Sequence, residues 1–444
     1  MKKTSSYMDN CGSMNISYEL VGVNRHINCT LGNATKQHFG TVGVLFIMYM
    51  AISLILPSGS VGPLNIKFIV LFIVLTLLIA TRPVFRSKFL LTVLLIFSAC
   101  IFWFFLGVVK TGSVAMSLSQ FKAVAITFLL PILSFYLLSR NIISDLNIYK
   151  AILYSTVFIS SIKVFLLVYS AVTGLNFIDI TFLLAKYFHA QIMTMKIAPF
   201  IYRFELPADL AGPLALFILL LRNRLNIDLR INIMQKMTYA ILIIFSVFIS
   251  YSRYIWAMTA VVAIIAFMFS RRIRNYSFFI VLAFLLSAIF YHPYFRSLTD
   301  RFFSHAVTVS DNIRLHELPY LLRYFETSPI FGHGLGAYVP SCIRDAYDKY
   351  SYEIQWGALL MQIGIVGIAA VCAALSLIAY PFICCGINKI KLALLILLAL
   401  WLSASFFNPY LTSSAAGVIF SFFVAAGYSV RNNTASNRSS RSIE

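Results

Sequence analysis

The chain has 444 residues, of which 60% are hydrophobic and only 11% are charged. This composition is typical of a polytopic membrane protein and excludes a soluble globular domain. The formal net charge is +20, but no soluble basic domain carries it, so we expect no nucleic-acid partner. Short cytoplasmic loops, where Lys and Arg orient membrane proteins, are the simplest source of the excess.

Residues 1–38 are polar and contain no apolar run, which predicts a cytoplasmic N-terminal tail and not a signal peptide. A membrane-spanning helix needs about 20 apolar residues, and somewhat fewer when it is short or bent. Twelve stretches meet this requirement: 39–57, 64–81, 89–109, 120–139, 148–172, 206–222, 237–251, 254–270, 275–292, 355–385, 391–407 and 412–430. The predicted fold class is therefore an all-α polytopic membrane protein with about 12 transmembrane helices.

The predicted helices form two groups separated by one long loop. Nine lie within 39–292, interrupted by the polar segment 173–205, and three lie within 354–430, after the loop 293–353. With the N-terminus inside, every loop on that side is basic, and so is the C-terminal tail 431–444. This asymmetry places both tails in the cytoplasm, and segment 173–205, Arg253 and the long loop together on the opposite side.

We expect the long loop to contain short helices, one of them lying on the membrane surface with Asp311 as its N-cap and a bend or restart at Pro319. Its polar face would carry Asn312, His316, Pro319, Arg323 and Glu326, and its apolar face Leu315, Leu318, Leu322 and Phe325. The glycines at 332, 334 and 336 permit positive φ or close approach of the backbone.

Three side chains are candidates for chemistry at the membrane surface. Arg203 precedes the predicted start of a span at Pro207, and it either reaches lipid phosphate or binds a ligand. Arg253 lies at the tip of a tight hairpin, where its guanidinium needs a partner; a phosphate group or a loop carboxylate would serve. Glu353 stands at the entrance of the tenth span, where it is either a general base or a helix-start acid favoured by the helix dipole.

Other polar side chains carry weaker signals. Lys163 lies within the fifth span, where an internal ion pair and a substrate contact are both open. His305, His316 and His333 share the long loop, but nothing in their spacing fixes them as ligands. We therefore expect no metal site and no cofactor.

Several motifs together resemble the O-antigen polymerase and O-antigen ligase superfamily. They are Arg203 followed by Glu205-Leu206-Pro207, Ser252-Arg253, Asn312-Ile313-Arg314-Leu315, the turn Ser328-Pro329-Ile330-Phe331-Gly332-His333-Gly334-Leu335-Gly336, and Leu359-Leu360-Met361-Gln362-Ile363-Gly364-Ile365-Val366-Gly367. The resemblance covers roughly residues 200–370. Each motif alone matches many sequences. The order of the motifs along the chain and their predicted location on one side of the membrane identify the superfamily more specifically.

The resemblance implies a glycosyltransferase of the bacterial inner membrane with its active site facing the periplasm. An oligosaccharide on undecaprenyl pyrophosphate would be the substrate, membrane lipid would surround the protein, and a chain-length regulator protein is a candidate partner. Glu353, Arg253 and Arg314 are expected to be catalytic. Arg203, Arg323, His333 and Tyr352 are expected to bind substrate.

One departure favours the polymerase over the ligase. Ligases of the superfamily usually carry a His eleven residues before the glycine that matches Gly364, and this chain has Glu353 there. Two alternatives stay open: a divergent ligase that joins polymer to lipid A–core, and a flippase or other transporter of lipid-linked oligosaccharide. A transporter would favour charged residues inside the bundle and small outer loops.

Overall fold

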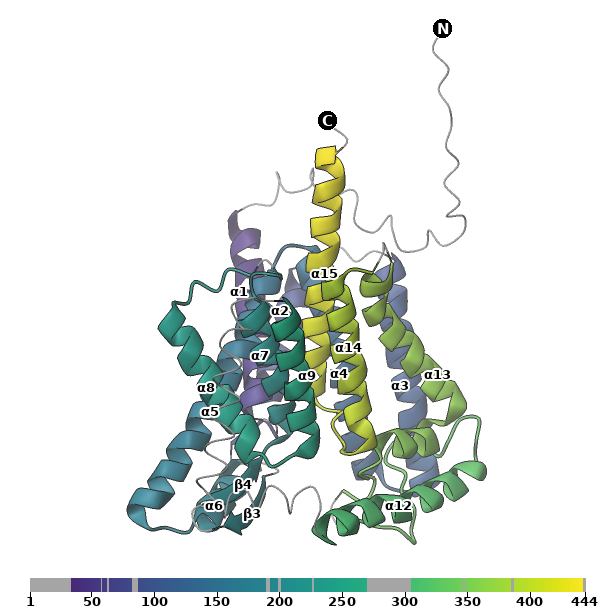
Figure 1. Cartoon of the computed structure of the whole chain (residues 1–444). Helices are drawn as coiled ribbons and strands as arrows, with labels where there is room; N and C mark the ends of the chain where they lie inside the picture. The colour runs from purple at the N-terminus through teal and green to yellow at the C-terminus, as the bar shows by residue number, and fades with distance from the viewer. Residues whose placement is uncertain are drawn as a thin grey trace.

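The computed structural model describes residues 33–56, 58–61, 64–81, 87–188, 192–198, 201–225, 227–269, 305–345, 348–384 and 387–441. These ranges are mainly helical (Figure 1). The helices are α1 (Asn33–Ile55), α2 (Ile66–Ala80), α3 (Ser87–Thr111), α4 (Val114–Ser139), α5 (Asp145–Thr173), α6 (Phe177–Phe188), α7 (Ala211–Leu221), α8 (Ile233–Ile249), α9 (Arg253–Phe269), α12 (His305–Glu326), α13 (Gln355–Ile383), α14 (Lys389–Ser403) and α15 (Ser414–Arg441). Two short 3-10 helices, Pro207–Leu210 and Ala404–Phe406, extend α7 and α14.

The predicted spans agree with helices wherever the structure describes them. Span 275–292, together with residues 293–304 of the long loop, lies outside the described residues. Among the described residues, six helices are long and apolar enough to cross a membrane, namely α3, α4, α5, α13, α14 and α15, and five further apolar helices have 10–17 residues. The chain is thus a mainly helical, multi-pass membrane protein, and the count of twelve spans stays a prediction.

The all-α prediction was wrong in one respect, because two antiparallel hairpins are present. Strands β1 (Ser60–Val61) and β2 (Leu64–Asn65) form one, and β3 (Met193–Ala198) and β4 (Ile201–Glu205) form the other. In the second hairpin Met195 pairs with Arg203, and Met193 with Glu205. The sequence of segment 173–205 contains no clear turn signal that would predict a hairpin.

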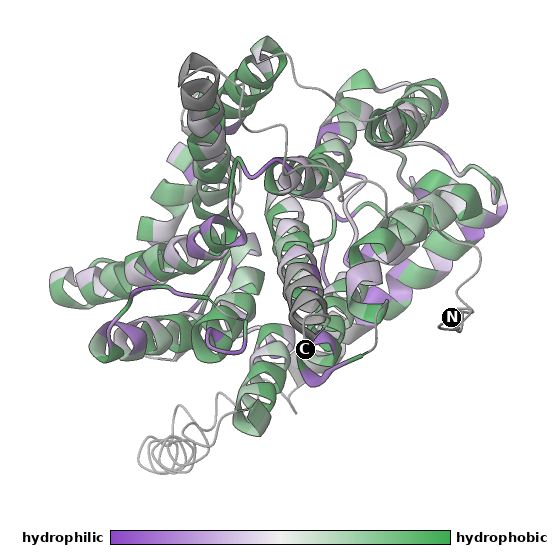
Figure 2. Cartoon of the chain, turned by 90° about the horizontal axis from the view of Figure 1, so that it is seen from above, coloured by the Kyte–Doolittle hydropathy of each residue, from purple (hydrophilic) through white to green (hydrophobic). Residues whose placement is uncertain are grey.

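Helix α15 lies at the centre of the bundle and packs on α4, α1, α5 and α13 (Figures 1 and 2). Its sequence explains this position, because small residues allow close approach of neighbouring helices in a membrane. A side chain at Gly417 would press on Leu130 and the Ile126 carbonyl of α4, and one at Gly427 would contact Pro381 of α13 at 3.0 Å. Hydrophilic residues concentrate at helix ends and loops (Figure 2).

Helix α12 lies across the end of the bundle, roughly perpendicular to the spanning helices (Figure 1). It begins at His305, so the prediction of Asp311 as its N-cap was wrong, and it continues through Pro319 without a restart. Pro319 is exposed, where the carbonyl freed by its missing N–H can bond to water. The predicted polar face is exposed at all five positions.

The predicted apolar face of α12 is only partly correct. Leu315 and Leu322 are 68% and 40% exposed, whereas Glu317 and Leu321 are buried against the start of α13. The buried side is thus rotated toward Arg314 and Glu317, two charged residues that a hydrophobic pattern assigns to solvent. Arg314 is partly buried, with an ion pair to Glu353, and Glu317 is buried, with a hydrogen bond from the Glu353 amide.

The glycine turn 328–336 is inserted into a break in α13. Gly364 has a φ of 65°, which interrupts the helix. The amides of His333 and Gly334 donate to the freed carbonyls of Met361 and Gln362, at 3.1 and 2.7 Å. The amides of Ile365 and Val366 donate to Pro329 and Ile330 in return. Backbone groups at membrane depth are thus satisfied by protein, and the loop is fixed to the bundle.

Candidate active site

Four separate parts of the chain meet at the end of the bundle that α12 covers, which we call the site end. The β3–β4 hairpin, the start of α9, the start of α13 and the loop 404–413 between α14 and α15 all lie there (Figure 1). The C-terminal end of α15 lies at the opposite end. The positions of the predicted site residues are therefore described relative to the site end.

The first feature of the site end is a carboxylate held between two arginines. Arg314 Nε lies 2.7 Å from Glu353 Oε2, and Arg344 Nη2 lies 2.6 Å from Glu353 Oε1. Glu353 is only 10% exposed, whereas Arg344 is 36% exposed. The contact of Arg314 is an ion pair without the alignment of a good hydrogen bond. A partly buried charge of this kind needs such partners.

A second carboxylate, Glu317, supports the first from α12. Its Oε2 accepts a hydrogen bond from the backbone amide of Glu353 at 3.0 Å, which fixes the turn before α13. Its Oε1 is buried and has no hydrogen-bond partner among the described residues. Burial raises the pKa of Glu317, and the neighbouring Arg344 opposes that effect. We call Arg314, Glu317, Arg344 and Glu353 the acid–arginine cluster.

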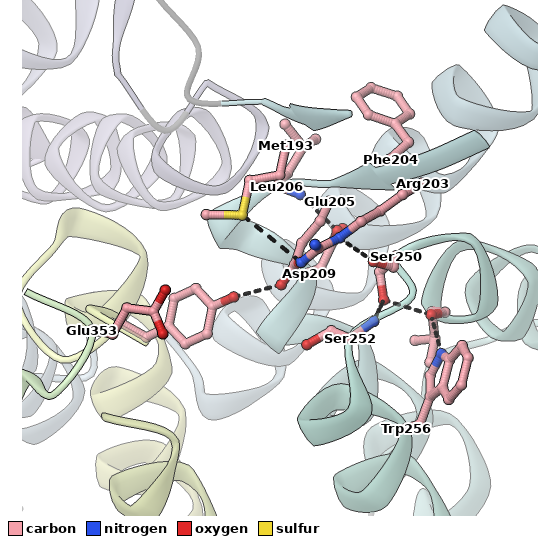
Figure 3. A network of polar contacts seen from close by, with 12 residues as sticks. Met193, Arg203, Phe204, Glu205, Leu206, Asp209, Ser250, Ser252, Trp256 and Glu353 are labelled. Carbon is pink, nitrogen blue, oxygen red and sulfur yellow. Dashed lines mark hydrogen bonds and ion pairs between the residues drawn. The ribbon is translucent and has the colours of Figure 1, made fainter. Parts of the chain in front are cut away.

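A second network lies on β4. Arg203 forms an ion pair with Glu205, and its Nε donates to the carbonyl of Ser250 at 3.3 Å. The hydroxyl of Tyr410 donates to the other oxygen of Glu205 at 2.6 Å. Burial, together with the Glu205 charge, raises the pKa of Tyr410. In Figure 3 Glu353 lies on the side of this network away from Ser250 and Trp256.

The loop 404–413 connects the two networks. Tyr410 binds Glu205, while the amide of Leu411 donates to Gln355 Oε1, two residues after Glu353. Phe407 lies 5.9 Å from the guanidinium of Arg314 and 5.8 Å from the ring of Tyr254. An apolar-aromatic loop of this length gives no signal of such contacts in the sequence.

Arg253 begins α9, directly after two buried residues in a strained turn. Tyr251 has a φ of 49°, rare for a non-glycine residue, and is 1% exposed. Arg203 binds the carbonyl of Ser250 in this turn, and Tyr254 faces Phe407 beside Arg314. The fold thus brings the backbone at Arg253 to the same region as Arg203 and Arg314.

The other three predicted substrate ligands lie outside these networks. His333 stacks on Tyr324, and its Nε2 is 2.9 Å from the Tyr324 carbonyl; burial lowers its pKa. Tyr352 is buried, and its hydroxyl accepts from the Val339 amide at 2.8 Å. Arg323 is exposed on α12. Substrate binding by these three residues stays a prediction, and the first two clearly hold the loop together.

Lys163 forms an internal ion pair, which is one of the two roles that its sequence position left open. Its Nζ lies 2.6 Å from Asp209 Oδ2 and donates to the Phe204 carbonyl at 2.9 Å, with both side chains buried. Asp209 also accepts from the Leu206 amide. This pair anchors the junction of β4 and α7, and so fixes Arg203 and Glu205 at the site end.

Sequence reasoning missed Arg344, Glu317, Glu205 and Tyr410. Glu205 is part of the motif that follows Arg203, but neither its position nor that of Glu317 along the chain indicated a role. Arg344 and Tyr410 reach the site through tertiary contacts alone. Within the described ranges, no three His, Cys, Asp or Glu residues gather in a way that could hold a metal ion.

Comparison with known proteins gives one family. Residues 238–372 match the family model described as O-antigen ligase. This range includes Arg253, α12, the glycine turn and the first half of α13. The chain matches no curated protein and no solved structure. Residues 238–372 of this multi-pass helical chain are thus similar to that family, and the match supports the resemblance to the O-antigen polymerase/ligase superfamily.

Proposed function

We propose that the protein is an O-antigen polymerase of the bacterial inner membrane, with its site end in the periplasm. It would transfer a growing glycan from undecaprenyl pyrophosphate to the non-reducing end of a lipid-linked repeat unit. The observation that carries this proposal is the pairing of Glu353 with Arg314 and Arg344 at the end of the bundle that also holds Arg203. Guanidinium groups suit a diphosphate, and a carboxylate suits a sugar hydroxyl.

In the proposed reaction, a hydroxyl oxygen of the acceptor attacks the anomeric carbon of the donor glycan. The bond between that carbon and the diphosphate oxygen breaks, and the hydroxyl proton passes to Glu353. The departing lipid diphosphate gains negative charge, which nearby arginines stabilise. The donor glycan is already activated by its bond to the lipid diphosphate, so the step needs no nucleotide.

The ion pairs suggest how substrate binding prepares the base. In the free protein both carboxylate oxygens of Glu353 are engaged by arginines. A diphosphate carries more negative charge than one carboxylate and would compete for the same guanidinium groups. Arg344 is partly exposed and is the partner better placed to turn toward a ligand. Glu353 would then be released toward the acceptor hydroxyl.

The ligase is the second candidate, because the matched family model carries that description. The acid at position 353, in place of the His typical of ligases, favours the polymerase. A transporter is less well supported. Lys163 and Asp209 are charged residues inside the bundle, but they bond to each other and to the backbone.

A deletion strain of the source bacterium separates the two enzymes. Loss of a polymerase leaves single repeat units on lipid A–core, whereas loss of a ligase leaves none. We expect single repeats on a lipopolysaccharide gel, with long ladders restored by the intact gene. Bare lipid A–core would contradict the polymerase and support the ligase.

Two variants test the site itself. Glu353→Gln keeps the shape of the side chain and removes its basicity, and Arg253→Ala removes a guanidinium. Each should reduce the rate of chain extension about 100-fold or more, since general-base and charge-stabilising groups typically contribute that much. The readout is ladder length on the same gel, with membrane insertion checked by immunoblot. Glu326→Gln, on the exposed face of α12, is the matched control, and near-normal ladders from Glu353→Gln would give Glu353 a structural role instead.

A further inference from the structure

The loop between α7 and α8 forms a basic pocket at the end of the bundle opposite to the site end (Figure 1). The cavity measures about 450 Å³ and is lined by Arg222, Asn223, Ile227, Asp228, Arg230 and Ile231. We call it the basic pocket. None of these residues takes part in the acid–arginine cluster or in the network of Arg203.

The local sequence explains how the basic pocket is held open. Ile227, Leu229 and Ile231 are buried, while Asp228 and Arg230 between them are exposed. This alternation fixes an extended segment over the apolar core with its polar side chains outward. Arg222 Nη1 donates to the Ile231 carbonyl at 3.2 Å and closes the loop at its base.

The charge around the basic pocket favours an anion. Residues 222–236 contain four cationic side chains, Arg222, Arg224, Arg230 and Lys236, and a single carboxylate, Asp228. Asp228 lies 3.6 Å from Arg230, but both side chains are more than three-quarters exposed, so this pair is weak. A bound phosphate would be attracted by this excess of positive charge.

An apolar stripe leads away from the basic pocket along α8. Met234, Met237 and Ile241 are 73%, 50% and 62% exposed, and Ile244 and Phe245 continue the stripe at 44% and 42%. Their spacing of three and four residues places them on one face of the helix. The stripe begins beside the last of the cationic residues, Lys236, so one molecule with a phosphate head and acyl chains would contact both.

We propose that the basic pocket binds the phosphate headgroup of an anionic phospholipid whose acyl chains lie along the exposed face of α8. Basic pockets between spanning helices are suited to such headgroups, and each Arg or Lys near an anionic lipid contributes about 1 kcal/mol, or about fivefold in affinity. Guanidinium groups bind phosphate oxygens bidentately, which favours Arg222 and Arg230 as the principal ligands. This site is independent of the proposed polymerase reaction.

The test is native mass spectrometry of the full chain in a neutral detergent, titrated with phosphatidylglycerol. We expect Arg222→Gln and Arg230→Gln each to weaken lipid binding about fivefold. Lys389→Gln, at an exposed position that starts α14 outside the pocket, should leave binding unchanged. Because Arg230 is 87% exposed, its variant should fold even if Arg222→Gln does not.

Three results would overturn the proposal. One is an equal loss of binding in Lys389→Gln, which would indicate a diffuse charge effect. Another is binding of phosphatidylcholine as tight as that of phosphatidylglycerol, since the net negative charge would then play no part. The third is displacement of the lipid by inorganic phosphate, which would assign the basic pocket to a free phosphate ion.

Discussion

At the scale of single residues, the main feature of the site end is a set of carboxylates that are largely buried. Glu353 and Glu205 each face an arginine, and each has a second partner, Arg344 and Tyr410 respectively. Burying a carboxylate is costly unless hydrogen bonds and opposite charges compensate. Glu317 is the exception, because one of its oxygens is buried with no hydrogen-bond partner among the described residues.

Glu317→Gln tests that exception through the pH dependence of stability. Burial raises the pKa of Glu317 in the folded protein above its unfolded value of about 4.3. The native state therefore binds more protons, and the contribution of Glu317 to stability falls as pH rises through this range. The glutamine cannot ionise, so we expect a higher midpoint of thermal unfolding at pH near 7.5, with little change near pH 4.

The measurement is thermal unfolding in detergent at several pH values, with Glu326→Gln on the exposed side of α12 as the control. A variant that is destabilised near pH 7.5 but not near pH 4 would show that the Glu317 carboxylate is needed in its charged form. That outcome would move Glu317 from a positioning role to an electrostatic one beside Arg344.

At the scale of elements, the insertion of the glycine turn into α13 is what gives the long loop a fixed position. A break in a spanning helix exposes carbonyls and amides that hydrocarbon cannot satisfy. The turn supplies their partners and also contacts α3, where the Leu335 amide donates to the Trp103 carbonyl at 2.9 Å. The start of α13, and with it Glu353, is thereby held against α12.

Gly334→Ala should disrupt this insertion. Gly334 has a φ of +86°, and a Cβ there would collide with the backbone of Gly107 in α3. We expect a large fall in the unfolding midpoint or loss of the folded protein. Gly112→Ala is the matched control, because Gly112 also has a positive φ, +66°, but nothing lies within 4 Å of its Cβ position. It should lose only about 1 kcal/mol of stability, the usual cost of the left-handed conformation, and equal effects of the two variants would contradict the close contact.

At the scale of the whole molecule, the two ends of the bundle differ in chemistry. The site end combines acids with arginines and aromatic residues, while the opposite end presents the basic pocket and the C-terminal end of α15. The positive-inside rule predicts that the latter end lies in the cytoplasm. Both substrates of the proposed reaction would then meet at the periplasmic surface.

Single cysteines placed in a cysteine-free variant test this orientation. Ser341→Cys, exposed in the long loop, should react in intact cells with a thiol reagent that cannot cross the inner membrane. Lys389→Cys, exposed at the start of α14, should react only after the cells are opened. The reverse pattern would invert the topology and exclude a periplasmic active site.

The sequence by itself determined the class of the protein. Apolar runs long enough to cross the hydrocarbon core, and the distribution of Lys and Arg between loops, are local properties that govern membrane insertion and orientation directly. The sequence also marked Arg203, Arg253 and Glu353, since a charge beside an apolar run is conspicuous along the chain, whereas Arg314 was marked only by the resemblance of its motif. Only the tertiary structure decided which charges are neighbours. Glu317, Tyr410 and the break at Gly364 gain their meaning from partners far away in sequence. Arg344 gains its meaning from an ion pair with Glu353 that no motif marks. Ion pairs and backbone hydrogen bonds depend on positions in space, and periodicity along the chain does not encode them.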